Sequence, residues 1–254
     1  MGSGERPAIE TAGLTKQYGD TVAVTDLTIA VPEGSIYGFL GPNGAGKTTT
    51  MRMLTTLTRP TAGNAWVAGS PITDRPAVTR HIGYLPEEPP VYDELTGREQ
   101  LEFVAGLREI PRDIAQDRID RLLYRFSLLT DADKRVQGYS RGMRQKLGVI
   151  QAILHRPAVV FLDEPTSGLD PRAARTMRDT IARLSAEGTT VFLSTHILPV
   201  IEELADTVGV IHQGRLVAEG DTQSLIARSE AGMDATLEDA FLAVTSEPHR
   251  TDAP

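Results

Sequence analysis

A glycine-rich stretch early in the chain has the residue types and the spacing of a phosphate-binding loop. Residues 41–48, Gly-Pro-Asn-Gly-Ala-Gly-Lys-Thr, fit the pattern G-x-x-x-x-G-K-[ST]. Glycines let consecutive backbone N–H groups turn toward one centre, and the N-terminus of a following helix adds partial positive charge at the same place. We expect a polyphosphate to bind there. The alternative is a glycine-rich turn whose Lys47 faces water, and the match at every position disfavours it.

The side chains at the end of this loop predict how the phosphates are held. Lys47 is expected to reach the β- and γ-phosphates as a point charge, and the Thr48 hydroxyl can take one position on Mg²⁺. The predicted nucleotide-binding residues of the loop are Gly41, Pro42, Asn43, Gly44, Ala45, Gly46, Lys47, Thr48 and Thr49.

Two carboxylates follow a strongly apolar run in the second half of the chain. Asp163 and Glu164 come directly after residues 159–162, and this is the end of a strand at which open parallel sheets bind their ligands. We expect Asp163 to hold magnesium, through water or the Thr48 hydroxyl, and Glu164 to polarise a water that attacks the γ-phosphate. A helix N-cap or a solvated acidic pair is the alternative, which the upstream phosphate loop makes less favourable.

The elements that must position these residues follow from hydrophobic periodicity. Residues 8–37 alternate apolar and polar positions, which predicts antiparallel strands, whereas apolar residues at steps of three and four predict helices over 94–155. Elsewhere strands and helices alternate, which predicts parallel strands joined by crossover helices. The predicted strands are 35–40, 159–162, 190–194 and 208–212, and the predicted helices are 48–57, 171–187 and 199–206.

Composition limits the remaining possibilities. The chain has 254 residues, 40% of them hydrophobic and 24% charged, which is typical of a globular protein. Cysteine is absent, which excludes thiolate catalysis, iron–sulfur clusters and cysteine zinc sites. The net charge of −8 argues against generic binding to nucleic acid. The first thirteen residues lack the apolar stretch of a signal peptide, and the strand-like run at 158–162 is far too short to cross a bilayer.

A third motif narrows the class of nucleotide-binding protein. Residues 139–145, Tyr-Ser-Arg-Gly-Met-Arg-Gln, resemble the Leu-Ser-Gly-Gly-Gln signature of ATP-binding cassette (ABC) nucleotide-binding domains, with departures at Arg141 and Met143. Ser140 and Gly142 keep the hydroxyl and the close-approach glycine at the start of a predicted helix. An isolated serine there would be interpreted as an N-cap. The remaining cassette motifs follow in the family's order, so that the resemblance covers residues 8–228.

The resemblance implies roles for four further residues. Tyr18 matches the aromatic residue on which the family stacks adenine, Asp170 lies in the D-loop, and His196 is the switch histidine, which joins Lys47 and Glu164 as a catalytic residue. Taken singly, Tyr18 could be half-buried packing and His196 a surface group. Glu87 stands where the Q-loop glutamine is expected, and it could serve Mg²⁺ as an oxygen ligand or orient a water. The glutamate at this position and the predicted helix at 237–245 resemble features of cassettes in the drug-exporter (ABC-2 type) branch of the family.

The same resemblance implies the fold. It is an α/β P-loop NTPase (RecA-like) core with an antiparallel β subdomain and an inserted α-helical subdomain. The expected boundaries are 8–228 for the nucleotide-binding domain, about 94–157 for the helical subdomain within it, 229–245 for a C-terminal helical extension and 246–254 for a disordered tail.

The function that the resemblance implies is that of an ATP-hydrolysing transporter subunit. ATP and Mg²⁺ are the expected cofactors, and two copies are expected to pair head to tail around two ATP, with Ser140, Gly142 and Asp170 contributing to binding. The expected partner is a separate integral membrane permease that carries out export, with this chain peripheral at the cytoplasmic face of the membrane and no nucleic acid bound. The alternative is a soluble ABC-type ATPase acting on nucleic acid or ribosomes. The transported substrate is not encoded in this chain.

Overall fold

The computed structural model describes residues 7–228 and 236–246, which form two sheets and a set of helices. A six-stranded sheet has the order β11-β10-β4-β9-β8-β7. Its strands are β4 (Ile36–Leu40), β7 (Ile82–Leu85), β8 (Val159–Asp163), β9 (Thr190–Thr195), β10 (Thr207–His212) and β11 (Arg215–Gly220). All neighbouring pairs are parallel except β10 with β11. The predicted parallel strands are thereby confirmed.

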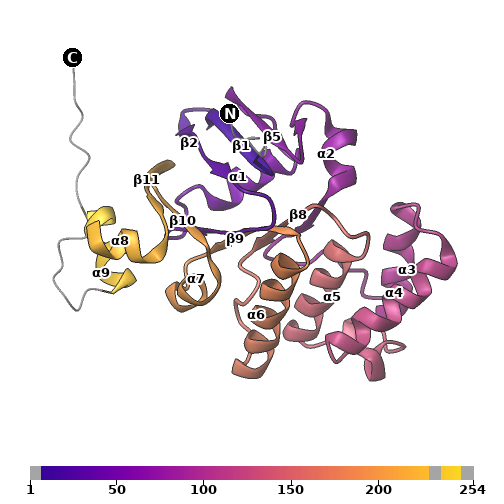
Figure 1. Ribbon diagram of the computed structural model, residues 1–254. Helices are drawn as coiled ribbons and strands as arrows, with labels where there is room; N and C mark the ends of the chain where they lie inside the picture. Colours follow the sequence, from indigo (N-terminus) through magenta and orange to yellow (C-terminus); the bar gives the residue numbers. More distant parts are fainter. Residues whose placement is uncertain (1–6, 229–235, 247–254) are drawn as a thin grey trace, which may run out of the picture.

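A smaller antiparallel sheet packs on one face of this central sheet. It has the order β2-β1-β5-β6, with β3 paired to β1. The strands are β1 (Ile9–Tyr18), β2 (Thr21–Leu27), β3 (Ala30–Val31), β5 (Ala62–Val67) and β6 (Ser70–Pro71). One hydrophobic core joins the two sheets and includes Met51, Met53 and Leu54 of helix α1 (Lys47–Leu54), which lies between them. Figure 1 shows this layer above the central sheet.

Helices cover the opposite face of the central sheet. Beneath it in Figure 1 lie α5 (Arg141–Ile153), α6 (Pro171–Ala186) and α7 (Leu198–Leu204). A second hydrophobic core runs from these helices into α3 (Gly97–Leu107) and α4 (Arg112–Arg125), which extend the molecule to the right. Helix α2 (Arg75–His81) precedes β7. The chain therefore folds as the expected α/β core with an antiparallel β layer and added helices.

Helix boundaries follow local capping. Thr96 begins α3 with a capping box, in which its hydroxyl accepts from the Glu99 N–H and the Glu99 carboxylate accepts from the Thr96 N–H. Helix α1 ends three residues before the predicted position 57, because Thr56 adopts a left-handed φ of 63° that a continuing helix cannot contain.

The C-terminal helices α8 (Thr222–Arg228) and α9 (Leu237–Ser246) pack beside β11, at the left of Figure 1. Part of the expected extension, 229–235, and the expected tail after Ser246 lie outside the described residues. No helix among the residues described has the length and hydrophobicity needed to cross a membrane.

Candidate active site

The phosphate loop lies where the sequence predicts, between the carboxyl end of β4 and the start of α1. Gly46 has a φ of 110°, a left-handed conformation that only glycine adopts readily. A Cβ atom at this position would lie 2.6 Å from the Ala23 carbonyl oxygen of β2. The loop therefore requires glycine at residue 46 both for its backbone and for its close approach to the antiparallel sheet.

Lys47 is buried at the base of this loop and points along it. Its Nζ donates to the carbonyl oxygens of Gly41, at 2.7 Å, and Pro42, at 3.2 Å, and lies 3.8 Å from Glu164 Oε1. Burial lowers the pKa of Lys47 from its usual range, and the negative charges of Glu164, Asp163 and Glu87 oppose that shift. The ammonium group is thus held inside the loop by backbone carbonyls and acidic neighbours.

Asp163 ends strand β8 and is 1% exposed. The Thr48 hydroxyl donates to its Oδ2 at 2.9 Å, and the Ser194 hydroxyl donates to its Oδ1. Both carboxylate oxygens therefore have hydrogen-bond partners, as a buried acid requires. The predicted pairing of Asp163 with Thr48 is present.

Glu164 turns out of the strand with a left-handed φ of 48° and is also buried. Its Oε2 accepts from the Thr195 hydroxyl at 3.0 Å, and its Oε1 lies 2.8 Å from His196 Nδ1. A carboxylate only accepts hydrogen bonds, so the imidazole donates from Nδ1. Glu164 and His196, which the sequence predicts to be catalytic together with Lys47, are therefore hydrogen-bonded to each other.

Ser194 and Thr195 were not assigned roles from the sequence, although they hold both acids. The reason is strand order: β8 and β9 are parallel neighbours, and Asp163 is in register with Ser194. The available signal was a pair of hydroxyl residues at the carboxyl end of a buried strand, beside the predicted His196.

A cleft of about 430 Å³ collects these groups. Ten of the residues that line it are site residues predicted from the sequence: Asn43, Gly44, Gly46, Lys47, Thr48, Thr49, Glu87, Asp163, Glu164 and His196. Ala23 and Ser167 line it as well. Gly41 and Pro42 contribute their carbonyls to Lys47, and Ala45 is buried behind the loop.

The structure does not bring four predicted residues into this cleft. Tyr18 is 47% exposed at the end of β1, with Lys16 Nζ 4.7 Å from its ring centroid. Ser140 caps α5 by accepting from the Met143 N–H, and Asp170 caps α6 by accepting from the Ala173 N–H. Gly142 lies in the first turn of α5. Within one chain, therefore, Ser140 and Asp170 serve as helix caps, and none of the four residues lines the cleft.

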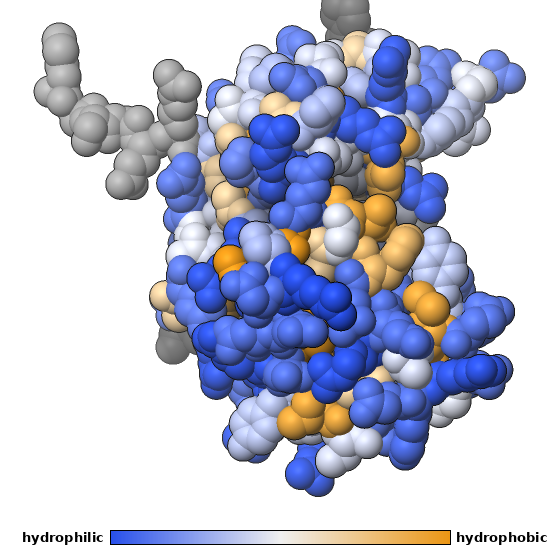
Figure 2. Space-filling model, turned by 90° about the vertical axis from the view of Figure 1, so that its right-hand side faces the viewer, coloured by the Kyte–Doolittle hydropathy of each residue, from blue (hydrophilic) through white to orange (hydrophobic). Residues whose placement is uncertain are grey.

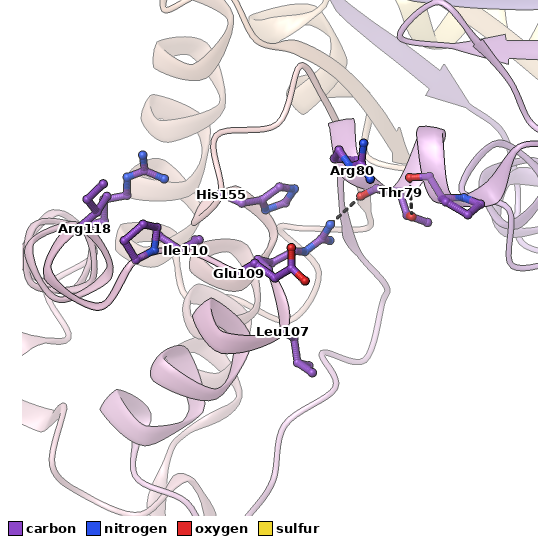
Figure 3. Close-up of a pocket in the computed structure, with 11 residues that line it drawn as sticks. Thr79, Arg80, Leu107, Glu109, Ile110, Arg118 and His155 are labelled. Carbon is purple, nitrogen blue, oxygen red and sulfur yellow. Dashed lines mark hydrogen bonds between the residues drawn. The ribbon is translucent and has the colours of Figure 1, made fainter.

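A second hollow, of about 510 Å³, lies between α2 and the ends of α3 and α4. Figure 3 shows Arg80 of α2, Glu109 of the α3–α4 connection and His155 of the segment after α5 around it. Arg108 crosses its floor and donates to the Thr79 carbonyl oxygen at 2.6 Å. We call this hollow the lobe groove.

Exposed apolar side chains border the lobe groove and the neighbouring surface. Leu107 is 67% exposed and Ile114 is 40% exposed, and on the same side of the lobe Tyr92 packs edge-on against Phe103. Figure 2 shows an apolar patch within the polar surface of this face.

Comparisons with known proteins agree with the motifs. Residues 24–167 match the ABC transporter family. The bacitracin transport ATP-binding protein BcrA of Enterococcus faecalis is 39% identical over 96% of this chain and 80% of its own length. The daunorubicin/doxorubicin resistance ATP-binding protein DrrA of Streptomyces peucetius is 44% identical over 86% of this chain and 66% of its own.

Solved structures have the same fold. The ATP-binding subunit of an ABC transporter superposes with a TM-score of 0.86 at 30% identity, covering 93% of this chain and 99% of that one. A dimeric ATP-binding cassette with bound ADP and phosphate has a TM-score of 0.77 over 84% of this chain and 98% of its own, and at 21% identity it supports the fold alone. From the phosphate loop, the paired acids and these relationships, the chain belongs to the ABC transporter family, as one of its ATP-binding ATPase subunits.

Proposed function

We propose that the 430 Å³ cleft binds ATP with Mg²⁺ and hydrolyses it, and that two copies of this chain close on two ATP molecules to drive a membrane partner. The observation that carries this proposal is the set of Lys47, Thr48, Asp163, Glu164 and His196, joined by hydrogen bonds and an ion pair at the carboxyl ends of three parallel strands. Ligands bind at this edge of open α/β sheets.

The phosphate loop supplies the binding contacts. Backbone N–H groups of residues 43–49 would surround the β- and γ-phosphates at the N-terminus of α1, where the helix dipole favours negative charge. Lys47 would exchange its present bonds to the Gly41 and Pro42 carbonyls for phosphate oxygens.

The residues beside the loop fit a magnesium ion. Thr48 and Asp163 already lie within 2.9 Å of one another and offer only oxygen atoms, the ligand type that Mg²⁺ prefers. Glu87 lines the same cleft and adds a carboxylate at its exposed rim. Bound there, the ion would neutralise charge on the phosphates.

Glu164 is the proposed base. Thr195 and His196 fix both of its carboxylate oxygens, so that the group has one orientation toward the cleft. A carboxylate held in this way can orient a water and accept its proton. His196 is half-exposed at the cleft edge, from which its other ring nitrogen could reach the γ-phosphate.

The signature residues support the need for a second copy. Ser140 and Gly142 lie at the start of α5, outside the cleft of their own chain. A head-to-tail pair would bring the N-terminus of α5 of one copy to the γ-phosphate held by the other, with Asp170 at the contact and Tyr18 against the adenine. ATP would then hold the pair together, and hydrolysis would release it.

A variant of Ser140 tests this pairing. Ser140→Asp keeps an N-cap acceptor, so α5 remains intact, but it adds a negative charge that would face the γ-phosphate. In a Glu164→Gln background with ATP and Mg²⁺, we expect a dimer by light scattering for Glu164→Gln alone. The double variant should remain a monomer and still bind ATP. A dimer in both would refute the role of Ser140.

The lobe groove is the proposed contact for the membrane partner. It combines an apolar rim, at Leu107 and Ile114, with the guanidinium groups of Arg108 and Arg118, which form no ion pair within the described part of the chain. Exposed apolar patches of this kind mark interaction sites. An integral permease subunit bound there would place this chain at the cytoplasmic face of the membrane. The roles named for the two relatives, bacitracin transport and daunorubicin/doxorubicin resistance, favour export.

A further inference from the structure

The largest of the three clefts described here lies away from the nucleotide. With a volume of about 730 Å³, it is enclosed by α4, the end of α5 and the end of α6. Its wall includes Pro157 and Thr189, which lie two residues before β8 and one before β9, so the cleft is at the amino ends of the strands whose carboxyl ends hold the nucleotide site. We call it the arginine cleft.

Four guanidinium groups line this cleft, those of Arg118, Arg121, Arg125 and Arg156, against one carboxylate, Glu187. Three of them lie on one face of α4 at spacings of three and four residues. Like charges at this spacing destabilise a helix. Against Glu187, and Asp117 that pairs with Arg121, the four cations leave an excess of two, which is unexpected in a chain whose net charge is −8.

The available partners do not neutralise the arginine cleft. Arg121 pairs with Asp117, and Arg125 Nη1 lies 3.9 Å from Glu187. Arg118 donates to the Leu154 carbonyl oxygen at 3.3 Å. Within residues 7–228 and 236–246, neither Arg118 nor Arg156 forms an ion pair, so no carboxylate of the described chain offsets these two charges.

The guanidinium groups also repel one another. Burial and the charge of Arg156 lower the pKa of Arg118, and burial and the charge of Arg183 lower that of Arg125 although Glu187 opposes it. In addition, Arg125 Nη2 is buried without a hydrogen-bond partner in the part of the chain that the structure describes. A bound anion would offset the repulsion between the guanidinium groups and would give Arg125 Nη2 a hydrogen-bond acceptor.

The backbone at Arg156 gives an independent indication. This residue has a left-handed φ of 56° just beyond the end of α5, where helices usually place glycine. A non-glycine residue in this conformation costs on the order of 1 kcal/mol. Favourable contact of cations with helix C-termini accounts for arginines near the helix ends, but it does not account for Arg118 in the middle of α4.

We propose that the arginine cleft binds an organic phosphomonoester. Guanidinium forks match phosphate oxygens in bidentate geometry, and a phosphomonoester carries about −1.5 to −2 charge at pH 7, closer to the excess of two cations than a single carboxylate is. Leu122, Leu154 and Leu184 provide an apolar wall for the rest of the molecule. The phosphate group can belong to a free metabolite or to a lipid headgroup.

Chemical modification of arginine tests the site at each residue and distinguishes a free metabolite from a lipid headgroup. Phenylglyoxal reacts with accessible guanidinium groups, and peptide mass spectrometry reports each site. At constant ionic strength, we expect phenyl phosphate to abolish the reactivity of Arg118 and Arg156 and inorganic phosphate to reduce it less, while Arg112, exposed on the same helix, stays reactive. Protection only by vesicles of phosphatidic acid, and not of phosphatidylcholine, would identify a lipid headgroup. Absence of protection by all probes, or equal protection by acetate, would overturn the proposal.

Arg156→Gly provides the matched variant. Glycine suits the left-handed φ, so the fold should be retained while one guanidinium is lost. Ser127→Gly is the control, because Ser127 has a similar φ of 55° and lies outside the cleft. The affinity for phenyl phosphate, measured by protection of Arg118, should fall about tenfold in Arg156→Gly, the loss expected for one charged hydrogen-bonding group, and should not change in Ser127→Gly. Steady-state ATP hydrolysis should remain unchanged in both. Unchanged protection in Arg156→Gly would refute the site.

Discussion

The nucleotide cleft and the lobe groove differ in how their charges are satisfied. In the nucleotide cleft, Lys47, Asp163 and Glu164 are buried and already joined to one another or to neighbouring hydroxyl groups. In the lobe groove, Arg108 and Arg118 donate only to backbone carbonyls and form no ion pair among the described residues. The comparison teaches that the core carries a preassembled set of reacting groups, whereas the helical lobe presents a surface that another molecule must complete.

The largest effect is expected from removing the base of the preassembled site. Glu164→Gln cannot accept a proton, so steady-state phosphate release should fall by a factor of about 10² to 10⁴ while ATP binding is retained. Glu202→Gln, on the exposed face of α7, is the control and should hydrolyse ATP at the wild-type rate. Equal rates for Glu164→Gln and wild type would show that the hydrogen-bonded set is not catalytic.

The next effect separates backbone strain from close packing in the phosphate loop. Gly46→Ala meets both a φ of 110° and the Ala23 carbonyl, so we expect the free energy of unfolding to fall by about 2 kcal/mol and nucleotide binding to be lost. Gly44→Ala also has a positive φ, 81°, but its Cβ would meet no atom within 4 Å. It should lose only about 1 kcal/mol. Urea unfolding and nucleotide titration measure both, and equal losses would exclude a role for the contact with β2.

A substitution in the lobe groove should weaken binding to the membrane partner without affecting folding or ATP hydrolysis. Leu107→Asn should leave folding and basal ATP hydrolysis of the isolated chain unchanged, because Leu107 is largely exposed. In cells that contain the membrane partner, we expect recovery with the membrane fraction to fall roughly tenfold, the effect of losing about 1.4 kcal/mol of apolar contact. Leu57→Asn, exposed elsewhere, is the control. Full membrane recovery of Leu107→Asn would mean that the partner binds another face.

The smallest effect concerns His155, which lies at the edge of the groove with Nε2 bonded to the Ile82 carbonyl. Burial, together with the charges of Arg108 and Arg118, lowers the pKa of His155 from its usual 6.5 to about 4, although the backbone hydrogen bond opposes this shift. Between these values the unfolded chain binds more protons than the folded one, so the stability due to neutral His155 is complete above pH 6.5 and is lost as the pH falls toward 4.

His155→Gln removes this titration. From pH 7 to pH 5, the unfolding free energy of the wild type should fall by about 1 kcal/mol more than that of the variant, after allowance for partial exposure. Urea unfolding at both pH values gives this difference. Parallel pH profiles would show that His155 titrates normally and that the groove arginines do not disfavour its charge.

Much of the nucleotide cleft could be predicted from the sequence because its residues are grouped in short motifs at the ends of recognisable strands. Lys47 and Thr48 come from one motif and Asp163 and Glu164 from another. Ser194 and Thr195 could not be assigned as their partners, because the neighbouring position of β8 and β9 is a property of sheet order. The arginine cleft was unpredictable for a similar reason: the ends of α4, α5 and α6 come together only in the folded chain.

The position of the arginine cleft at the amino ends of β8 and β9 has a consequence for experiments on both sites. Strand β8 has five residues, and a strand rises about 3.3 Å per residue, so roughly 16 Å of buried backbone separates one end from the other. Salt does not enter this interior, so charges are screened less across it than in solvent, where the Debye length is about 8 Å at physiological ionic strength. At an effective dielectric constant of about 20, unit charges at this separation interact by only about 1 kcal/mol. The two clefts share no lining residue, so each can be titrated with its own anion and the coupling between them should be weak.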